Sequence, residues 1–166
     1  MQGSMHPGAE ILTRLFTFRK REIGIGMTRF TNKLGGRVVV MGMSTAGNWS
    51  SSLLNYRRQR LIQDQLVWLG AQTVFVRNEP HIYLVMNEAD DPADAGFFGM
   101  LTISNLNPDP VEGISLYLPE SWRKAKRVLR LDREGAWRPF EAEAETDGVR
   151  LPVRLDHTRP EAFLFA

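Results

Sequence analysis

The stretch Asn32–Leu69 decides how the rest of the chain is interpreted. It opens with NKLGGR at 32–37, continues with the apolar run VVVM at 38–41, and reaches the glycine-bounded loop GMSTAG at 42–47. Three serines then offer N-caps for a helix that extends to Leu69. Because a continuous apolar run is typical of a strand buried on both faces, this stretch predicts one strand–loop–helix unit of an α/β layer.

Two more strands are expected before this unit, over residues 9–18 and 24–30, where apolar residues alternate with polar residues or glycines. The first five residues, MQGSM, have a second methionine directly after a Gly-Ser pair, which is typical of an expression tag. We therefore set residues 1–8 apart as a tag or disordered segment. Residues 9–70 are predicted to form a strand–strand–strand–helix segment.

The sequence after Gly70 is typical of short antiparallel strands. Turn signals such as Glu134-Gly135 and Asp147-Gly148 separate apolar runs that recur every 8 to 14 residues. The expected strands cover residues 73–77, 82–87, 97–105, 114–118, 126–131, 137–143, 149–155 and 162–165. The predicted fold class is therefore mainly β (α+β), with an antiparallel β-sandwich of about eight short strands over 71–166.

Composition excludes several classes of function. The net charge of +2 is too small to indicate a nucleic-acid partner, and no apolar run approaches the roughly 20 residues of a membrane span. The chain has no cysteine, and its three histidines share no metal-ligand spacing, so we expect no metal and no cofactor. The absence of cysteine favours a reducing, cytoplasmic compartment, but the natural N-terminus is hidden and localisation stays open.

One motif favours an enzyme. The loop at 42–47 places Ser44 between a strand and a helix, as in a nucleophile elbow, and Asp132 or Asp156 followed by His157 would complete the chain order of a serine hydrolase. Ala46 replaces the second glycine of that motif, and an α/β-hydrolase sheet needs more strand–helix units than this chain contains. A small serine hydrolase that uses Ser44 is therefore kept as an alternative function.

Four residues are candidates for ligand binding. Trp49 follows Asn48 in the loop before the helix, and Trp122 and Trp137 each follow a polar turn. An exposed indole ring at any of these positions could stack on the apolar face of a sugar. The alternative interpretation is that each ring covers the core.

The segment N-x-x-GGRVVVMG at 32–42, followed by a loop and a leucine-rich helix, resembles the end of the amidotransferase-like domain of family 42 β-galactosidases. In those enzymes a small C-terminal β-sandwich follows, and the runs at 74–76, 82–87, 101–106 and 151–165 are similar to its strands. The resemblance implies that the catalytic carboxylates lie on an upstream barrel, so no catalytic residue is expected in this chain.

The resemblance therefore implies a non-catalytic accessory domain of a glycoside hydrolase-like, carbohydrate-active protein. Its expected roles are packing, assembly or weak sugar contact. The implied partners are the upstream catalytic domain, a carbohydrate, and a second copy of the chain in a homo-oligomer. A generic β-sandwich interaction domain is the remaining alternative.

Overall fold

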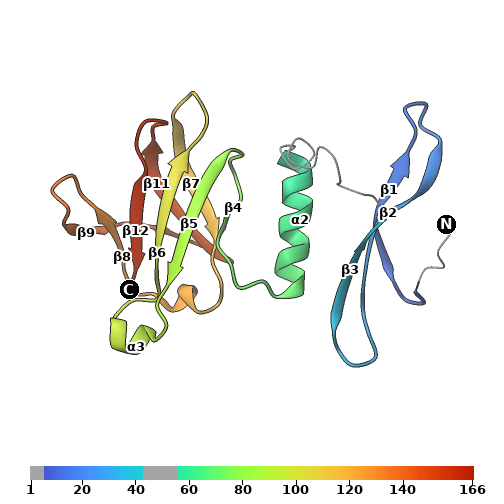
Figure 1. Cartoon of the computed structure of the whole chain (residues 1–166), viewed down its shortest axis with the longest axis horizontal. Helices are drawn as coiled ribbons and strands as arrows, with labels where there is room; N and C mark the ends of the chain where they lie inside the picture. The colour runs from blue at the N-terminus through green and yellow to red at the C-terminus, as the bar shows by residue number, and fades with distance from the viewer. Residues whose placement is uncertain (1–5, 43–55) are drawn as a thin grey trace. The chain divides into compact units, whose positions relative to one another are not determined.

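The computed structural model of the chain describes residues 6–42 and 56–166 (Figure 1). The chain divides into two compact units, Met1–Ala71 and Gln72–Ala166, and each is described by itself. This division lies one residue from the predicted boundary between 70 and 71. Within the described residues, no helix is long and apolar enough to cross a membrane.

Among its described residues, the first unit has three antiparallel strands and the helix α2. The strands β1 (Glu10–Phe16), β2 (Glu22–Thr31) and β3 (Arg37–Met41) form a sheet in the order β1-β2-β3, and α2 (Tyr56–Leu69) contacts β3. The β2–β3 turn is organised by Asn32, whose Oδ1 accepts hydrogen bonds from the backbone N–H groups of Leu34 and Gly36 at 2.9 and 2.8 Å. This short hairpin makes the two strands antiparallel neighbours.

The prediction that residues 38–41 form a parallel-type strand buried on both faces is wrong. β3 pairs only with β2, in antiparallel register, and is an edge of its sheet. Val40 and Met41 are 48% and 41% exposed. A run of apolar residues gives no information about the direction of the neighbouring strand, whereas the short turn at 32–36 fixes that direction.

Trp68 holds the end of α2 against the sheet. The guanidinium groups of Arg29 and Arg37 lie 5.2 and 5.8 Å from the centre of its ring, and Arg37 Nη1 donates a hydrogen bond of 2.6 Å to the Trp68 carbonyl. Cation–π contacts of this kind each stabilise by about 0.5–1 kcal/mol at exposed sites. Trp68 is therefore part of the packing of the first unit.

The second unit is an antiparallel β-sandwich, and it confirms the predicted fold class. One sheet has the order β10-β11-β7-β4 and the other the order β5-β6-β12-β8-β9. The strands are β4 (Phe75–Val76), β5 (Ile82–Glu88), β6 (Gly99–Asn105), β7 (Val111–Tyr117), β8 (Val128–Leu131), β9 (Trp137–Phe140), β10 (Glu143–Glu145), β11 (Gly148–Leu155) and β12 (Glu161–Phe165). Two short helical segments, α3 (Pro92–Ala95) and η1 (Trp122–Lys124), lie in the connections.

The core lies between the two sheets, where alternate residues of each strand face inward. On β6 the pattern is strict, with Leu101 and Ile103 fully buried and their neighbours partly exposed. Phe163 and Phe165 of β12 are also buried, at 0% and 1% exposure. Ile114, Leu116, Leu151 and Leu155 complete this core from the four-stranded sheet.

The structure splits one predicted strand in two. Residues 137–143 were expected to be continuous, but β9 ends at Phe140 in the five-stranded sheet and β10 begins at Glu143 in the four-stranded sheet. The chain crosses between the sheets at Glu141 and Ala142. The sandwich therefore has nine strands (four plus five) rather than about eight.

Candidate functional site

Two of the four predicted ligand-binding residues, Asn48 and Trp49, lie outside the described residues, as does Ser44 of the alternative hydrolase motif. A third, Trp122, is only 1% exposed. Its Nε1 donates a 3.1 Å hydrogen bond to Glu88, and its ring packs at 5.2 Å from that of Phe165. The expectation of an exposed ring at Trp122 is therefore wrong.

The burial of Trp122 depends on a residue that is distant in the sequence. A Cβ atom on Gly99 would lie 2.0 Å from the Trp122 ring, so only glycine leaves room for the indole at this end of the sandwich. The polar residues next to Trp122 in the sequence did not indicate that its ring is buried, because the space for the ring is left by Gly99 of β6. Trp122 acts as a core residue that closes one end of the sandwich.

The fourth residue, Trp137, begins β9 and is partly buried. It pairs with Leu131 of β8, while Phe140 of the same strand contacts the core residue Phe163 edge-on at 5.3 Å. Because residues 137 and 140 are separated by an odd number of positions, their side chains point to opposite faces of the sheet. Trp137 therefore lies on the outer face of the five-stranded sheet.

That outer face is uncharged and largely apolar. We define it by the outward-pointing residues of the five strands: Tyr83, Val85, Asn87, Met100, Thr102, Ser104, Leu129, Leu131, Trp137, Pro139, Ala162 and Leu164. One row crosses the whole sheet, because Met100 pairs with Asn87 and Leu164, and Leu129 pairs with Leu164 and Pro139. Tyr83 and Val85 are 58% and 41% exposed.

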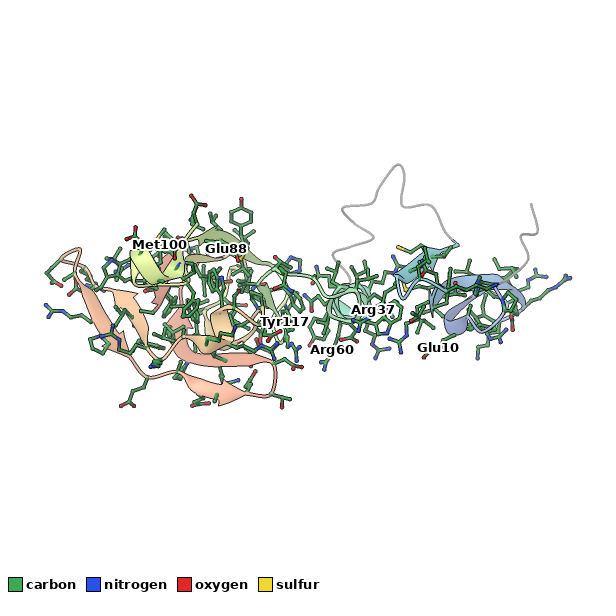
Figure 2. The ribbon with its side chains drawn as sticks, turned by 90° about the horizontal axis from the view of Figure 1, so that it is seen from below. Glu10, Arg37, Arg60, Glu88, Met100 and Tyr117 are labelled. Atoms are coloured by element: carbon green, nitrogen blue, oxygen red, sulfur yellow. The ribbon has the colours of Figure 1, made fainter. Side chains whose placement is uncertain are left out.

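The four-stranded sheet has an outer face of the opposite character, which we call the charged face. Its outward-pointing residues are Phe75, Glu112, Ser115, Tyr117, Glu143, Glu145, Arg150, Pro152 and Arg154, of which Ser115 and Tyr117 are themselves buried. Arg154 pairs with Glu112 at 3.0 Å, Arg150 lies 3.7 Å from Glu143, and the Ser115 hydroxyl donates to Glu145 at 2.8 Å. Figure 2 labels one residue of each sheet, Met100 in the five-stranded sheet and Tyr117 in the four-stranded sheet.

A cleft of about 860 Å³ opens where the chain crosses from β9 to β10. Its apolar lining includes Val128, Phe140 and Val149, which pack against the core. Its charged lining consists of Arg123, Lys126, Arg127, Glu141, Glu143 and Glu145. Within the described part of the chain, no three His, Asp or Glu residues are arranged to hold a metal ion, in this cleft or elsewhere.

The β8–β9 hairpin carries the clearest electrostatic effects. Asp132 accepts hydrogen bonds from the backbone N–H of Ala136 at 2.7 Å and from Nε of Arg138 at 2.9 Å, and these lower the pKa of its carboxyl. On β8, the 2.8 Å hydrogen bond from Arg130 to the buried carboxylate of Glu161 raises the pKa of Arg130.

Comparisons with known proteins give no identification. No family model, no curated protein and no solved structure matches the chain. The functional argument therefore depends on the surfaces described above and on the resemblance drawn from the sequence.

Proposed function

We propose that this chain is a non-catalytic accessory domain of a carbohydrate-active, glycoside hydrolase-like protein, and that its β-sandwich serves in assembly. The resemblance of residues 32–42 and of the later strands supports the carbohydrate-active part, and it assigns catalysis to an upstream domain. The observation that carries the assembly role is the uncharged outer face of the five-stranded sheet.

Antiparallel sheets with one solvated face normally alternate apolar residues inside with polar residues outside. β12 and β8 depart from this pattern, because Leu164 and Leu129 point outward beside inward residues that are also apolar. Exposed apolar area of this kind lowers solubility and is uncommon unless it is covered in the working protein. The outward-pointing leucines therefore favour an outer face that another surface covers in the working protein.

The occupant that we propose is a second copy of the chain. In a two-fold contact each residue meets the same set of residues on its partner, so a charged face would bring like charges together. The outer face has no charged residue and pairs with itself without this cost. It also carries Tyr83, Met100 and Trp137, which belong to the residue types that are enriched at interface centres.

The size of the face predicts a weak dimer. Five strands about 4.8 Å apart, each with about six residues at 3.3 Å, cover roughly 20 Å by 20 Å, or about 400 Å². Stable specific interfaces bury about 800 Å² on each partner. We therefore expect a dissociation constant of about 10–100 μM, which corresponds to roughly −5.5 to −7 kcal/mol.

Light scattering behind a sizing column tests this proposal over a range of protein concentrations. The chain is expected to be monomeric at about 1 μM and mostly dimeric at several hundred μM. Val85→Glu places a charge on the outer face and should abolish the dimer while the melting curve stays cooperative. Arg154→Ala on the charged face changes the net charge by the same amount and should leave the dimer intact.

Two results would overturn the proposal. One is a wild-type chain that stays monomeric at several hundred μM. The other is a dimer that persists in Val85→Glu, because the contact would then lie elsewhere on the molecule.

A further inference from the structure

Four arginines converge on a concave surface at the β8–β9 hairpin. This surface, which we call the arginine cleft, has a volume of about 410 Å³. It is lined by Arg130, Leu131, Asp132, Arg133, Glu134, Arg138, Pro139, Phe140 and Arg159. The lining carries four positive and two negative side chains, an excess of two positive charges, which equals the formal net charge of the whole chain.

Three of the arginines belong to the β8–β9 hairpin, and the fourth comes from a distant segment of the chain. Arg130 belongs to β8, Arg133 to the hairpin turn, Arg138 to β9, and Arg159 to the connection between β11 and β12. Like charges brought together by the fold repel one another, and this repulsion opposes folding. A bound anion would offset that repulsion, whereas four arginines placed apart on the surface would need no such partner.

Two of the guanidinium groups are held in fixed positions. Nε of Arg130 donates to Glu161, which is only 6% exposed, and Nε of Arg138 donates to Asp132. Asp132 is itself fixed, because its other oxygen accepts the backbone N–H groups of Glu134 and Ala136. Each of these hydrogen bonds is donated by Nε and leaves the two Nη groups of the guanidinium available. The Nη groups can bind an oxyanion bidentately.

The other two arginines have no carboxylate partner. Among the described residues, neither Arg133 nor Arg159 forms an ion pair, although both line the arginine cleft. Their charges are therefore not neutralised by a direct ion pair within the described chain. Leu131, Pro139 and Phe140 add apolar surface, so the cleft combines positive charge that is not ion-paired with area for the body of a ligand.

We propose that the arginine cleft is a binding site for a small ligand that carries an oxyanion, in the form of a carboxylate, sulfate or phosphate group. A volume of about 410 Å³ lies within the range of small-molecule sites, about 300–1,000 Å³, and is too small for a large polymer. The inference goes beyond the proposed assembly role. Arg130 and Arg138 point to the inward side of β8 and β9, whereas the outer face lies on the opposite side of those strands; Leu131 and Pro139 border both surfaces.

The test is an NMR titration of the uniformly labelled full chain at constant ionic strength. The probes are sodium glucuronate, glucose 6-phosphate and sodium sulfate, with glucose as the neutral control. We expect saturable shifts of the backbone amides of residues 130–140 and 157–161 with each anion, with dissociation constants of about 1–10 mM, and no such shifts with glucose.

Two charge-matched double variants locate the site. Arg133→Gln with Arg159→Gln removes the two arginines that form no ion pair and should weaken binding of glucuronate by at least about tenfold. Arg150→Gln with Arg154→Gln removes two arginines from the charged face and should leave the dissociation constant unchanged. Tighter binding of glucuronate than of sulfate would show that the sugar ring contributes, whereas equal affinity would show that the cleft recognises the oxyanion alone; both results support the proposal.

Amide shifts that fail to saturate with every anion, or an equal loss of binding in both double variants, would overturn the proposal. Translational diffusion measured on the same samples reports dimerisation separately. A failure of anion binding can therefore be distinguished from a failure of the proposed function.

Discussion

The two outer faces of the sandwich differ in chemistry although the inner faces are alike. Both sheets bury leucine, isoleucine and other apolar side chains between them. Outside, the charged face carries ion pairs such as Arg154–Glu112, whereas the outer face of the five-stranded sheet has Leu129, Met100 and Leu164 in one continuous row. Ion pairs exposed to water contribute only about 0–1 kcal/mol each, so their main effect here is to keep the charged face solvated.

This difference indicates that the sandwich has one surface suited to water and one suited to a partner. None of the outer-face residues belongs to the buried core between the two sheets or packs against it. Of the buried hydrophobic side chains described, all but Met27 belong to the second unit. Apolar residues on the outer face therefore need an explanation outside the folded monomer, and the proposed assembly would supply one.

The largest expected effect is a difference in the free energy of unfolding between variants of two neighbouring residues of β12. Phe163 is fully buried, so Phe163→Ala should lower the free energy of unfolding by about 3–5 kcal/mol. Leu164 points to the outer face and is partly exposed, so Leu164→Ala should cost about 1 kcal/mol or less in dilute solution. Urea unfolding at about 1 μM protein, where the proposed dimer would be dissociated, measures both free energies. Equal losses would show that the outer face is packed against the monomer itself.

A smaller effect, on the pH dependence of stability, is expected from Asp132. Its side chain is a carboxylate, and the outer face carries no carboxylate. Its pKa in the folded state is lowered by the hydrogen bond from Ala136 and by Arg138. A lowered folded-state pKa means that the stabilisation is complete above the ordinary pKa of aspartate and is lost as the pH falls through the lowered value. An NMR titration of the Asp132 carboxyl and the Ala136 amide should give an apparent pKa below the ordinary range for aspartate.

The matched control for this titration is Asp132→Asn, which keeps an oxygen acceptor at the turn. The Ala136 amide should then show no titration step in that range. A wild-type carboxyl that titrates at the ordinary pKa of aspartate would contradict the hydrogen-bonded geometry of the β8–β9 turn.

The sequence was sufficient for the fold class, because turn signals and alternating apolar residues recur after Gly70. It did not predict that β3 is an antiparallel edge, since the run VVVM is compatible with either direction of pairing. It also did not predict the burial of Trp122, which depends on the space left by Gly99 in a distant strand.

Both candidate surfaces escaped prediction for the same reason. Leu129, Met100 and Leu164 form one row only after three strands that are distant in the sequence become neighbours. The arginine cleft likewise requires Arg159 to lie beside a hairpin that begins at Val128, more than thirty positions earlier. Local patterns predict which face a side chain takes, but they do not predict which side chains of other strands lie next to it.

The most direct test of the central claim compares the two outer faces by hydroxyl-radical footprinting at low and high protein concentration. Methionine, tryptophan, tyrosine and phenylalanine side chains react with radicals, so the outer face and the partly exposed Phe75 of the charged face each supply probes. We expect oxidation of Tyr83, Met100 and Trp137 to slow at least about threefold between 1 and several hundred μM, as dimerisation covers the outer face. Modification of Phe75 on the charged face should stay unchanged. Equal rates for the outer-face residues at both concentrations, or protection of the charged face instead, would contradict the account.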